Sequence, residues 1–237
     1  MRALLLAGGL GTRLRPLTDA LPKCLVPIRG VPLLDYWLDL LLGAGIARIL
    51  INTHYRAQQV RDHVAGSPWR DRLDLVHEET LLGTGGTLLA NRGFFGGEAF
   101  LVAHADNLTR FDVQAFERRH AERPDGCLIT MMTFDTDNPR SCGIVEQDDQ
   151  GVVRAFHEKV ADPPGTRANG AVYICEPALL DWLHGLGKPV IDLSTEVIPA
   201  FLGRIATFHN SDYLRDIGTP ESLITAEKEY PVTPLLT

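Results

Sequence analysis

The sequence predicts a doubly wound α/β fold, in which helices cover both faces of a mostly parallel sheet. Short runs rich in Leu, Ile and Val recur through the first half of the chain. These runs are apolar throughout rather than alternating, which is typical of strands buried on both faces. Longer amphipathic stretches separate them, as crossover helices separate parallel strands.

In the first half of the chain, expected strands and expected helices alternate. The pattern predicts strands at residues 2–8, 46–54, 73–79 and 99–107. It predicts helices at residues 32–45, 56–66 and 112–123, and a loop running into a helix at residues 83–95. Glycines at the end of the first helix supply its stop signal.

The second half has more closely spaced strands. They are expected at residues 126–135, 142–159, 168–175 and 204–210, and helices at residues 176–186 and 192–203. The turn in EQDDQGVV predicts an antiparallel hairpin. A final helix is expected to begin at Pro220 with Thr219 as its N-cap. We therefore expect one mixed domain with a small antiparallel appendage, and we expect the C-terminal YPVTPLLT to fray rather than to form an arm between subunits.

Composition narrows the class of protein. The chain has 237 residues and a net charge of -7, which argues against a nucleic-acid-binding surface. No apolar run is long enough to span a bilayer, and the first apolar run is too short for a signal peptide, so no membrane partner is expected. The four cysteines lack metal-type spacing and indicate no disulfide framework. We expect a cytoplasmic protein.

The loop after the first expected strand concentrates glycines and cations. Gly8, Gly9 and Gly11 follow the strand, and Arg13 and Lys23 come shortly afterwards. Ligands of open parallel sheets bind beyond the carboxyl ends of the strands, where glycines let backbone N–H groups approach an anion. A guanidinium and an ammonium add charge suited to phosphate oxygens. The loop therefore predicts a triphosphate site, whereas the glycines by themselves would indicate only a turn.

The spacing of this loop excludes two familiar phosphate-binding motifs. A dinucleotide-binding G-x-G-x-x-G that begins at Gly9 would need a third glycine where Leu14 stands. A P-loop needs Gly-Lys followed by Ser or Thr, and the GLGKP at residues 185–189 follows a helix and lacks the hydroxyl residue. A nicotinamide-dependent oxidoreductase is therefore disfavoured.

The stretch AGGLGTRLRPLTDALPKCLVPI, residues 7–28, resembles the signature of the sugar-1-phosphate nucleotidyltransferases, or NDP-sugar pyrophosphorylases. It matches G-G-x-G-T-R-L-x-P-L-T-x-x-x-P-K-x-L. The resemblance implies a Rossmann-like nucleotide-diphospho-sugar transferase fold in which Arg13 and Lys23 bind the triphosphate. It also implies one domain over residues 1–237, with a nucleotide-binding half at 1–125, a sugar-phosphate-binding half at 126–237, and no C-terminal β-helix domain.

Two carboxylates are candidates for a metal site. Asp106 follows an apolar strand, where the family usually reads Gly-Asp and this chain reads Ala-Asp. YLRDIGTPESL resembles the family's W-x-D-I-G-T-P element and places Asp216 opposite Asp106. The resemblance implies that both bind Mg²⁺, whose preferred ligands are carboxylate oxygens. A plain helix-capping role for Asp106 is the alternative.

Other elements of the resemblance concern the sugar phosphate. FHEKV resembles the family's E-K-P element and implies that Glu158 binds sugar hydroxyls and Lys159 binds the sugar phosphate. Val160 replaces the usual proline, and an isolated Glu-Lys pair would indicate only a surface ion pair. ANGAVYI and SCGIVE resemble the elements that place Asn169 and Gly143 against the sugar.

The stretch HEETLLGTGGTL resembles the L-G-T-[AG]-G pattern of guanylyltransferases that act on mannose- or heptose-1-phosphate. The residues that the resemblance implies for catalysis are Arg13, Lys23, Asp106 and Lys159. The residues that it implies for nucleotide binding are Leu6, Ala7, Gly8, Gly9, Gly11, Thr12, Arg13, Lys23, Glu79, Gly83, Thr84 and Asp106. Those implied for the sugar phosphate are Gly143, Glu158, Lys159, Asn169 and Asp216.

The implied reaction is condensation of a sugar-1-phosphate with a nucleoside triphosphate, with Mg²⁺ as cofactor, to give an NDP-sugar for cell-surface polysaccharides and pyrophosphate. GTP is favoured as the nucleotide. A uridylyltransferase acting on N-acetylmuramate-1-phosphate or another hexose-1-phosphate stays open, as does a non-catalytic relative that binds nucleotide sugars. The patterns also leave open whether the protein forms a homodimer.

Overall fold

The computed structural model describes residues 1–231, which divide into two compact units. Of the described residues, the first unit contains 1–81, 103–113 and 212–231, and the second contains 82–102 and 114–211. The fold is mixed α/β, with a largely parallel sheet and smaller antiparallel pairings. This is the predicted fold class. Residues 232–237, which include most of the stretch expected to fray, lie outside the described residues.

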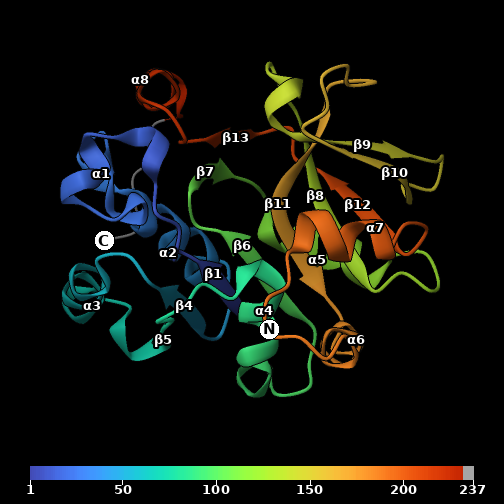
Figure 1. Ribbon diagram of the computed structural model, residues 1–237, viewed down its shortest axis with the longest axis horizontal. Coiled ribbons are helices and arrows are strands. Elements are labelled where there is room, and N and C mark those ends of the chain that lie inside the picture. The colour runs from blue at the N-terminus through green and yellow to red at the C-terminus, as the bar shows by residue number, and fades with distance from the viewer. Residues whose placement is uncertain (232–237) are drawn as a thin grey trace. The chain divides into compact units, whose positions relative to one another are not determined.

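The first unit is built on parallel strands. β1 (Arg2–Leu6) pairs with β4 (Ile49–Thr53), which pairs with β5 (Leu73–His77), all in parallel (Figure 1). The end of β6 (Phe100–His104) lies beside β1, where the Ala105 N–H donates to the Leu6 carbonyl at 3.0 Å. All four strands therefore end at one edge of the sheet, and the loops that follow them start there.

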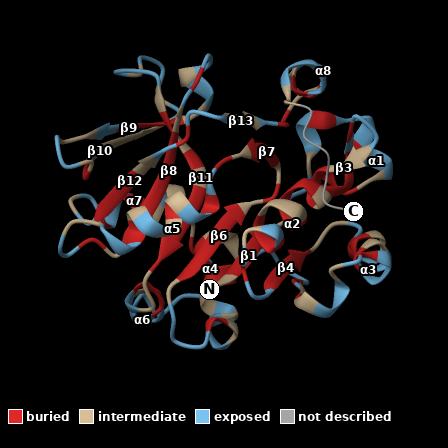
Figure 2. Ribbon diagram, turned by 180° about the vertical axis from the view of Figure 1, so that it is seen from behind, coloured by how far each residue is buried: buried red, intermediate tan, exposed pale blue. Residues whose placement is uncertain are grey.

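Helices of the first unit bury one face and expose the other (Figure 2). They are α1 (Leu17–Ala20), α2 (Leu33–Gly43), α3 (Ala57–Gly66) and α8 (Pro220–Glu229). The N-cap of α8 is Thr219, whose hydroxyl accepts the Ser222 N–H at 3.2 Å, so the predicted start of this helix is confirmed. Short 3-10 turns lie at Thr12–Leu14, Lys23–Leu25 and Arg70–Arg72, and a small hairpin joins β2 (Pro27–Ile28) to β3 (Val31–Pro32).

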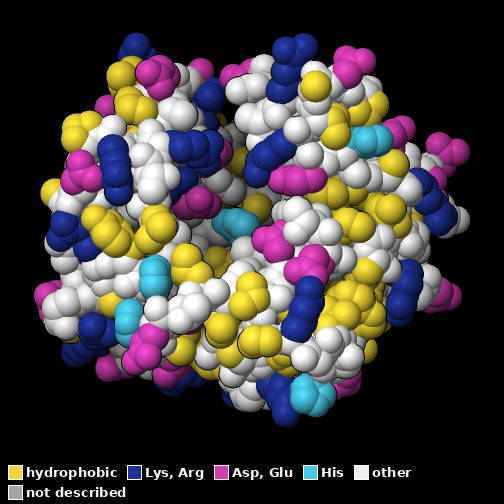
Figure 3. Space-filling model, in the orientation of Figure 1, with side chains coloured by type: hydrophobic (Ala, Val, Ile, Leu, Met, Phe, Trp, Pro, Cys, Tyr) yellow, Lys and Arg dark blue, Asp and Glu magenta, His cyan; other side chains and the backbone are white. Residues whose placement is uncertain are grey.

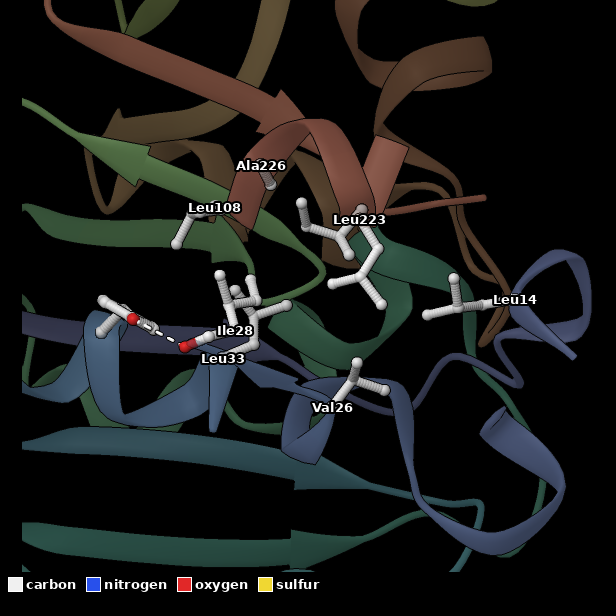
Figure 4. Close-up of a cluster of buried hydrophobic side chains, with 9 residues drawn as sticks. Leu14, Val26, Ile28, Leu33, Leu108, Leu223 and Ala226 are labelled. Atoms are coloured by element: carbon white, nitrogen blue, oxygen red, sulfur yellow. Dashed lines mark hydrogen bonds between the residues drawn. The ribbon is translucent and has the colours of Figure 1, made fainter. Parts of the chain in front are cut away.

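A second, antiparallel ladder in the first unit joins distant parts of the chain. β7 (Asn107–Arg110) pairs with β13 (Tyr213–Asp216), with Asn107 opposite Asp216. α8, which follows this ladder in the sequence, packs on a buried apolar cluster drawn in Figure 4. The cluster contains Leu14, Val26, Ile28, Leu33, Tyr36, Leu108, Ile217, Leu223 and Ala226. α8 is thus fixed against the segment that follows β1.

The second unit is dominated by antiparallel pairing. Its strands are β8 (Ile129–Asp135), β9 (Gly143–Gln147), β10 (Val153–Glu158), β11 (Arg167–Cys175) and β12 (Ile205–His209). β9 and β10 form the predicted hairpin, β11 pairs antiparallel with β8 and β9, and β12 pairs parallel with β8. The predicted antiparallel appendage is therefore confirmed.

The helices of the second unit are α4 (Gly83–Ala90), α5 (Val113–Ala121, whose first residue belongs to the first unit), α6 (Ala178–Gly185) and α7 (Ile198–Ala200). A π-helical turn at Leu193–Val197 leads into α7, and 3-10 turns lie at Arg92–Phe95 and Pro139–Ser141. α4 begins within the glycine-rich stretch itself, at Gly83.

The surface mixes charges of both signs, as the face drawn in Figure 3 shows. Within residues 1–231, no helix has the length and apolar character needed to cross a membrane.

Candidate active site

Four charged side chains of the first unit meet in one cluster. The Lys23 ammonium lies 3.0 Å from an Asp106 carboxylate oxygen and 3.1 Å from an Asp216 carboxylate oxygen. The Arg13 guanidinium lies 3.4 Å from the other Asp216 oxygen. The Lys23 side chain is only 8% exposed, whereas Asp106 and Asp216 are 42% and 49% exposed. A buried ammonium thus joins two carboxylates that remain open to a ligand.

The fold explains how residues so far apart in sequence meet. Asp106 follows β6 at the carboxyl edge of the sheet, and Asp216 is the last residue of β13. The β7–β13 ladder places Asp216 opposite Asn107, and the Ile217 N–H donates to the Asp106 carbonyl at 3.3 Å. The short strands β7 and β13, whose sequences show little periodicity, therefore determine the distance between the two carboxylates.

Gly218 is fitted closely to the charged cluster. A Cβ added at this position would lie 2.7 Å from an Asp216 carboxylate oxygen and 2.9 Å from the Arg13 guanidinium. The Ser222 hydroxyl also donates to the Asp216 carbonyl, so the start of α8 holds the backbone of Asp216. The glycine is needed for close approach, and the conformation of Asp216 depends on the residues that follow it.

The charges in the cluster control the ionisation of Asp106. The surrounding protein would by itself raise the pKa of this carboxyl, but the Lys23 ammonium and His104 favour the charged form, and the pKa lies below its usual value. Asp106 is therefore ionised at neutral pH.

The two carboxylates of the cluster suit a hard divalent cation that also binds phosphate oxygens of a substrate. Among the described residues, no group of three or more His, Cys, Asp or Glu side chains could hold a metal ion. Mg²⁺, however, is commonly bound by only one or two carboxylates together with substrate phosphates. The exposed carboxylates of Asp106 and Asp216 match that pattern.

The glycine-rich loop beside β1 presents a row of backbone N–H groups. Among the described residues, the N–H groups of Gly9, Leu10 and Gly11 have no intramolecular hydrogen-bond partner. Gly11 has a left-handed φ of 63°, and its carbonyl accepts the Thr18 hydroxyl at 2.8 Å. Successive backbone N–H groups without intramolecular partners are available to bind an anion.

The remaining loop residues of the predicted nucleotide set are placed differently. The N–H groups of Ala7 and Gly8 donate to the Asn52 side chain, and the Leu6 carbonyl accepts from Ala105. Thr12 is exposed at the start of a 3-10 turn. In the loop, therefore, the N–H groups at residues 9–11 are free, whereas those at residues 7 and 8 are occupied.

In the second unit, the predicted Glu158, Lys159 and Gly143 lie together. The Lys159 ammonium is 2.9 Å from a Glu158 carboxylate oxygen, and the Lys159 N–H donates to the Cys142 carbonyl at 3.1 Å. A Cβ at Gly143 would lie 2.6 Å from the other Glu158 oxygen. Lys159 has a left-handed φ of 49°, and its side chain is 63% exposed. The ion pair is open to an incoming anion.

Asn169 lies on β11 and is engaged within its own strand. Its amide nitrogen donates to the Tyr173 hydroxyl at 2.7 Å, and its amide oxygen accepts the Ala171 N–H at 2.9 Å. These bonds span an irregularity in the β8–β11 ladder and fix the orientation of the amide. One N–H of the amide is left over for a ligand.

The predicted base-reading residues are split between the two units, and their local contacts differ. Glu79 is exposed in the first unit. In the second unit, the Thr84 hydroxyl accepts the Leu193 N–H at 2.7 Å and lies 3.4 Å from Asp192. Gly83 packs so closely that an added Cβ would lie 2.5 Å from the Ile191 carbonyl oxygen.

The glycines of the GTGG stretch therefore have a packing role. Cβ atoms added at Gly85 and Gly86 would lie 2.9 Å from the Ile191 side chain and 2.2 Å from the Pro189 carbonyl oxygen. The absence of side chains lets the start of α4 dock on residues 189–191. This contact explains the glycine pattern without a ligand.

Sequence reasoning missed Asn52, Glu78 and Gly218 as parts of the site. Asn52 is nearly fully buried, at 4% exposure, and donates to the Glu78 carboxylate at 3.2 Å. A polar residue at the end of an otherwise apolar strand was the available signal, because the ligand edge of a parallel sheet lies there. Gly218 could not be assigned to the site from the sequence, because the Gly-Thr-Pro stretch is already explained by the start of a helix.

Comparison with known proteins assigns the chain to a family. A family described as Nucleotidyl transferase matches residues 2–232. The mannose-1-phosphate guanylyltransferase of Mycobacterium tuberculosis is 33% identical over 228 residues, which cover 94% of this chain and 62% of the relative. The catalytic subunit beta of the Drosophila melanogaster mannose-1-phosphate guanylyltransferase is 30% identical, covering 94% of this chain and 61% of that protein. The chain thus spans about three fifths of the length of these relatives.

Solved structures agree on the fold. HddC from Yersinia pseudotuberculosis complexed with GMP-PN has a TM-score of 0.82 and 25% identity, covering 97% of this chain and 99% of that one. A putative glucose-1-phosphate thymidylyltransferase from Bacillus anthracis has a TM-score of 0.85 at 19% identity, covering 99% and 98% of the two chains. With the family match over nearly its whole length, the chain belongs to the nucleotidyl transferase family.

Proposed function

We propose that the protein condenses a sugar-1-phosphate with a nucleoside triphosphate, releasing pyrophosphate and an NDP-sugar. The observation that carries the proposal is the cluster of Arg13, Lys23, Asp106 and Asp216, which lies within a single unit of the chain. Next to it in sequence is a loop whose free N–H groups suit phosphate oxygens. Cations, carboxylates and backbone donors together are what a polyphosphate and its counterion require.

The chemistry is an in-line displacement at the α-phosphorus of the nucleotide. An oxygen of the sugar phosphate forms a new bond to that phosphorus while the bond to the oxygen bridging the α- and β-phosphates breaks. The bridging oxygen leaves with pyrophosphate. The attacking oxygen is already anionic, so no general base is needed, and catalysis consists of positioning and charge stabilisation.

Each charged residue has a part in that stabilisation. The N–H groups of residues 9–11 and the Arg13 guanidinium bind the departing pyrophosphate. Lys23 neutralises charge beside the reacting phosphates while it holds Asp106 and Asp216 in place. The two carboxylates would hold Mg²⁺, which supplies neutralisation of the phosphate oxygens when bound.

Glu158 and Lys159 are proposed to bind the sugar phosphate. The exposed Lys159 ammonium suits a phosphate, and Glu158 suits sugar hydroxyls. Gly143, whose missing side chain leaves room for the Phe156 ring and the Glu158 carboxylate, is proposed to lie against the sugar, and Asn169 to contribute its remaining N–H.

GTP and mannose-1-phosphate are the proposed substrates, with heptose-1-phosphate as a further sugar. The names of the curated relatives support mannose-1-phosphate and a guanylyl group, and a similar solved structure was complexed with GMP-PN. A nucleotide-sugar supply for cell-surface polysaccharides follows from such a product. We propose a cytoplasmic location because all four cysteines are free, as is usual in reducing compartments.

A substrate matrix tests the proposal. GTP, UTP, ATP and dTTP are each combined with mannose-, heptose-, glucose- and N-acetylmuramate-1-phosphate, with Mg²⁺, and pyrophosphate release is recorded. GTP with mannose-1-phosphate is expected to give the highest kcat/KM. A maximum with UTP and N-acetylmuramate-1-phosphate would reassign the substrates, and tight GTP binding without pyrophosphate release would indicate a non-catalytic relative. No binding and no release in any combination would refute the function.

A further inference from the structure

We propose that Asn52 is the positioning residue of the phosphate-binding loop. Its side-chain amide occupies the first two N–H groups of the loop and thereby directs the next three toward the triphosphate. The inference rests on the proposed function of the loop and assigns a new role to a residue outside the loop's motif.

Asn52 contacts the loop at the point where the loop leaves the sheet. It lies on β4 opposite Leu6, the last residue of β1. Its amide oxygen accepts the Ala7 N–H at 2.7 Å and the Gly8 N–H at 3.3 Å. One buried oxygen therefore receives two successive backbone donors, and this fixes the direction in which the chain turns.

The orientation of the Asn52 amide is set from its other end. The amide nitrogen donates to the Glu78 carboxylate at 3.2 Å, and Glu78 is only 6% exposed. The Glu78 backbone is anchored in turn, because its N–H donates to the Thr53 carbonyl at 2.8 Å and its carbonyl lies 2.7 Å from His54 Nδ1. A carboxylate accepts and does not donate, so the nitrogen must face Glu78 and the oxygen must face the loop.

The consequence lies in the next residues of the loop. With the donors of Ala7 and Gly8 occupied, the free donors begin at Gly9 and run through Gly11. The Thr18 hydroxyl holds the loop again at the Gly11 carbonyl. The loop is thus held on both sides of Gly9 and Leu10, which reduces the conformational entropy that it loses when it binds an anion.

The proposal predicts that the acceptor at residue 52 is required, and a charge swap tests this requirement. Asn52→Leu keeps the approximate shape but removes the acceptor. Asn52→Asp keeps an acceptor but sets a carboxylate against Glu78. In the double variant Asn52→Asp/Glu78→Gln, the new amide at residue 78 can donate to the new carboxylate, and the total charge is that of the unmodified protein.

The measurement is the Kd of the full chain for inorganic tripolyphosphate with Mg²⁺, together with KM for GTP and for mannose-1-phosphate. Asn52→Leu and Asn52→Asp should each weaken tripolyphosphate binding and raise KM for GTP by about tenfold or more, with KM for mannose-1-phosphate changed less than threefold. The double variant should recover most of the loss. Asn91→Leu is the matched control, because Asn91 donates to the Thr87 carbonyl at the end of α4, outside the loop; it should leave both GTP and tripolyphosphate affinities unchanged.

The outcomes separate this inference from the function itself. Asn52 variants with unchanged affinities in an active protein would overturn the positioning role alone, as would a double variant no better than Asn52→Asp. If Asn52→Leu does not fold, the comparison of Asn52→Asp with the double variant still decides. A wild-type protein that neither binds tripolyphosphate nor releases pyrophosphate would refute both proposals.

Discussion

Lys23 is the residue on which the charged cluster depends. Its side chain is almost fully buried and touches two carboxylates, while the carboxylates themselves are about half exposed. Buried cations are stable only when paired, and removing one partner leaves like charges facing each other. The ammonium therefore has a structural and an electrostatic function at once.

Replacing Lys23 by methionine keeps the length of the side chain and removes the charge. We expect kcat for pyrophosphate release to fall on the order of 10²-fold or more, as for other preorganised charge stabilisers. The pKa of Asp106 should rise, because the Lys23 ammonium is the main group that lowers it. Lys228→Met on the exposed face of α8 serves as the control, and turnover of Lys23→Met equal to that control would remove Lys23 from the mechanism.

Gly218 offers a steric test of the same cluster. Gly218→Ala should lower kcat/KM by about tenfold or more, because the new methyl group would displace either the Asp216 carboxylate or the Arg13 guanidinium. Gly165→Ala is the matched control, since a Cβ there meets nothing within 4 Å. Steady-state kinetics of the two variants decide, and equal activity would show that the close approach at Gly218 is unimportant.

At the scale of elements, α8 connects the charged cluster to an apolar core. Leu223 is buried in the cluster of Figure 4, whereas its neighbour Ile224 is 52% exposed. Leu223→Ala should reduce the free energy of unfolding by about 2–4 kcal/mol, and Ile224→Ala by less than about 0.5 kcal/mol. Urea unfolding of the two variants measures the difference, and similar values would mean that α8 is not held by this core.

The junction of α5 with β8 and β11 predicts a dependence of stability on pH. His120 is buried, its Nδ1 lies 2.7 Å from the Thr130 hydroxyl, and its Nε2 lies 3.2 Å from Glu176. Burial, and then the nearby Arg123 charge, outweigh the opposing effect of Glu176 and lower the pKa of His120 to about 4. Since Glu176 accepts, the neutral ring donates from Nε2 and accepts the Thr130 hydroxyl at Nδ1.

Because the unfolded chain binds this proton near pH 6.5 and the folded chain near pH 4, protonation favours unfolding between those values. Stability is unaffected by His120 above about pH 6.5 and falls as the pH decreases below it. When the pH falls from 7 to 5, protonation of His120 should lower the free energy of unfolding by about 2 kcal/mol. His120→Gln, which does not titrate, should lose less stability over the same interval in urea unfolding; parallel pH profiles would contradict the assignment.

Regular elements were predictable from the sequence because their patterns are local. The apolar runs of β1, β4 and β6, the β9–β10 turn and the Thr-Pro start of α8 each carry their signal within a few residues. The β7–β13 ladder was not predicted, because four-residue strands such as NLTR and YLRD have no decisive periodicity. That ladder is what brings Asp106 beside Asp216.

For the site, motifs identified the charged residues but not their supports. Arg13, Lys23, Asp106 and Asp216 stand in recognisable stretches, and in the structure their side chains lie together. Their catalytic roles remain predictions. Asn52 and Glu78 stand in no such stretch, and they meet through a hydrogen bond between residues 26 positions apart in sequence.

For the whole molecule, the order of the chain matters more than any one motif. The first unit is completed only where the chain returns to it at Asp212, beyond the last residue of the second unit in the sequence. The cluster unites residues 13, 23, 106 and 216, so it exists only in the folded first unit. Any large loss of the β13–α8 segment should therefore abolish activity even though the glycine-rich loop is intact.

The central claim is that this cluster directs attack of a sugar phosphate on the α-phosphorus of a nucleotide. Incubation with mannose-1-phosphate, Mg²⁺ and GTP labelled at either the α- or the γ-phosphorus tests it most directly. The account predicts that the α label appears in the sugar nucleotide and the γ label in pyrophosphate. Release of the γ label as inorganic phosphate, or absence of the α label from any sugar product, would contradict it.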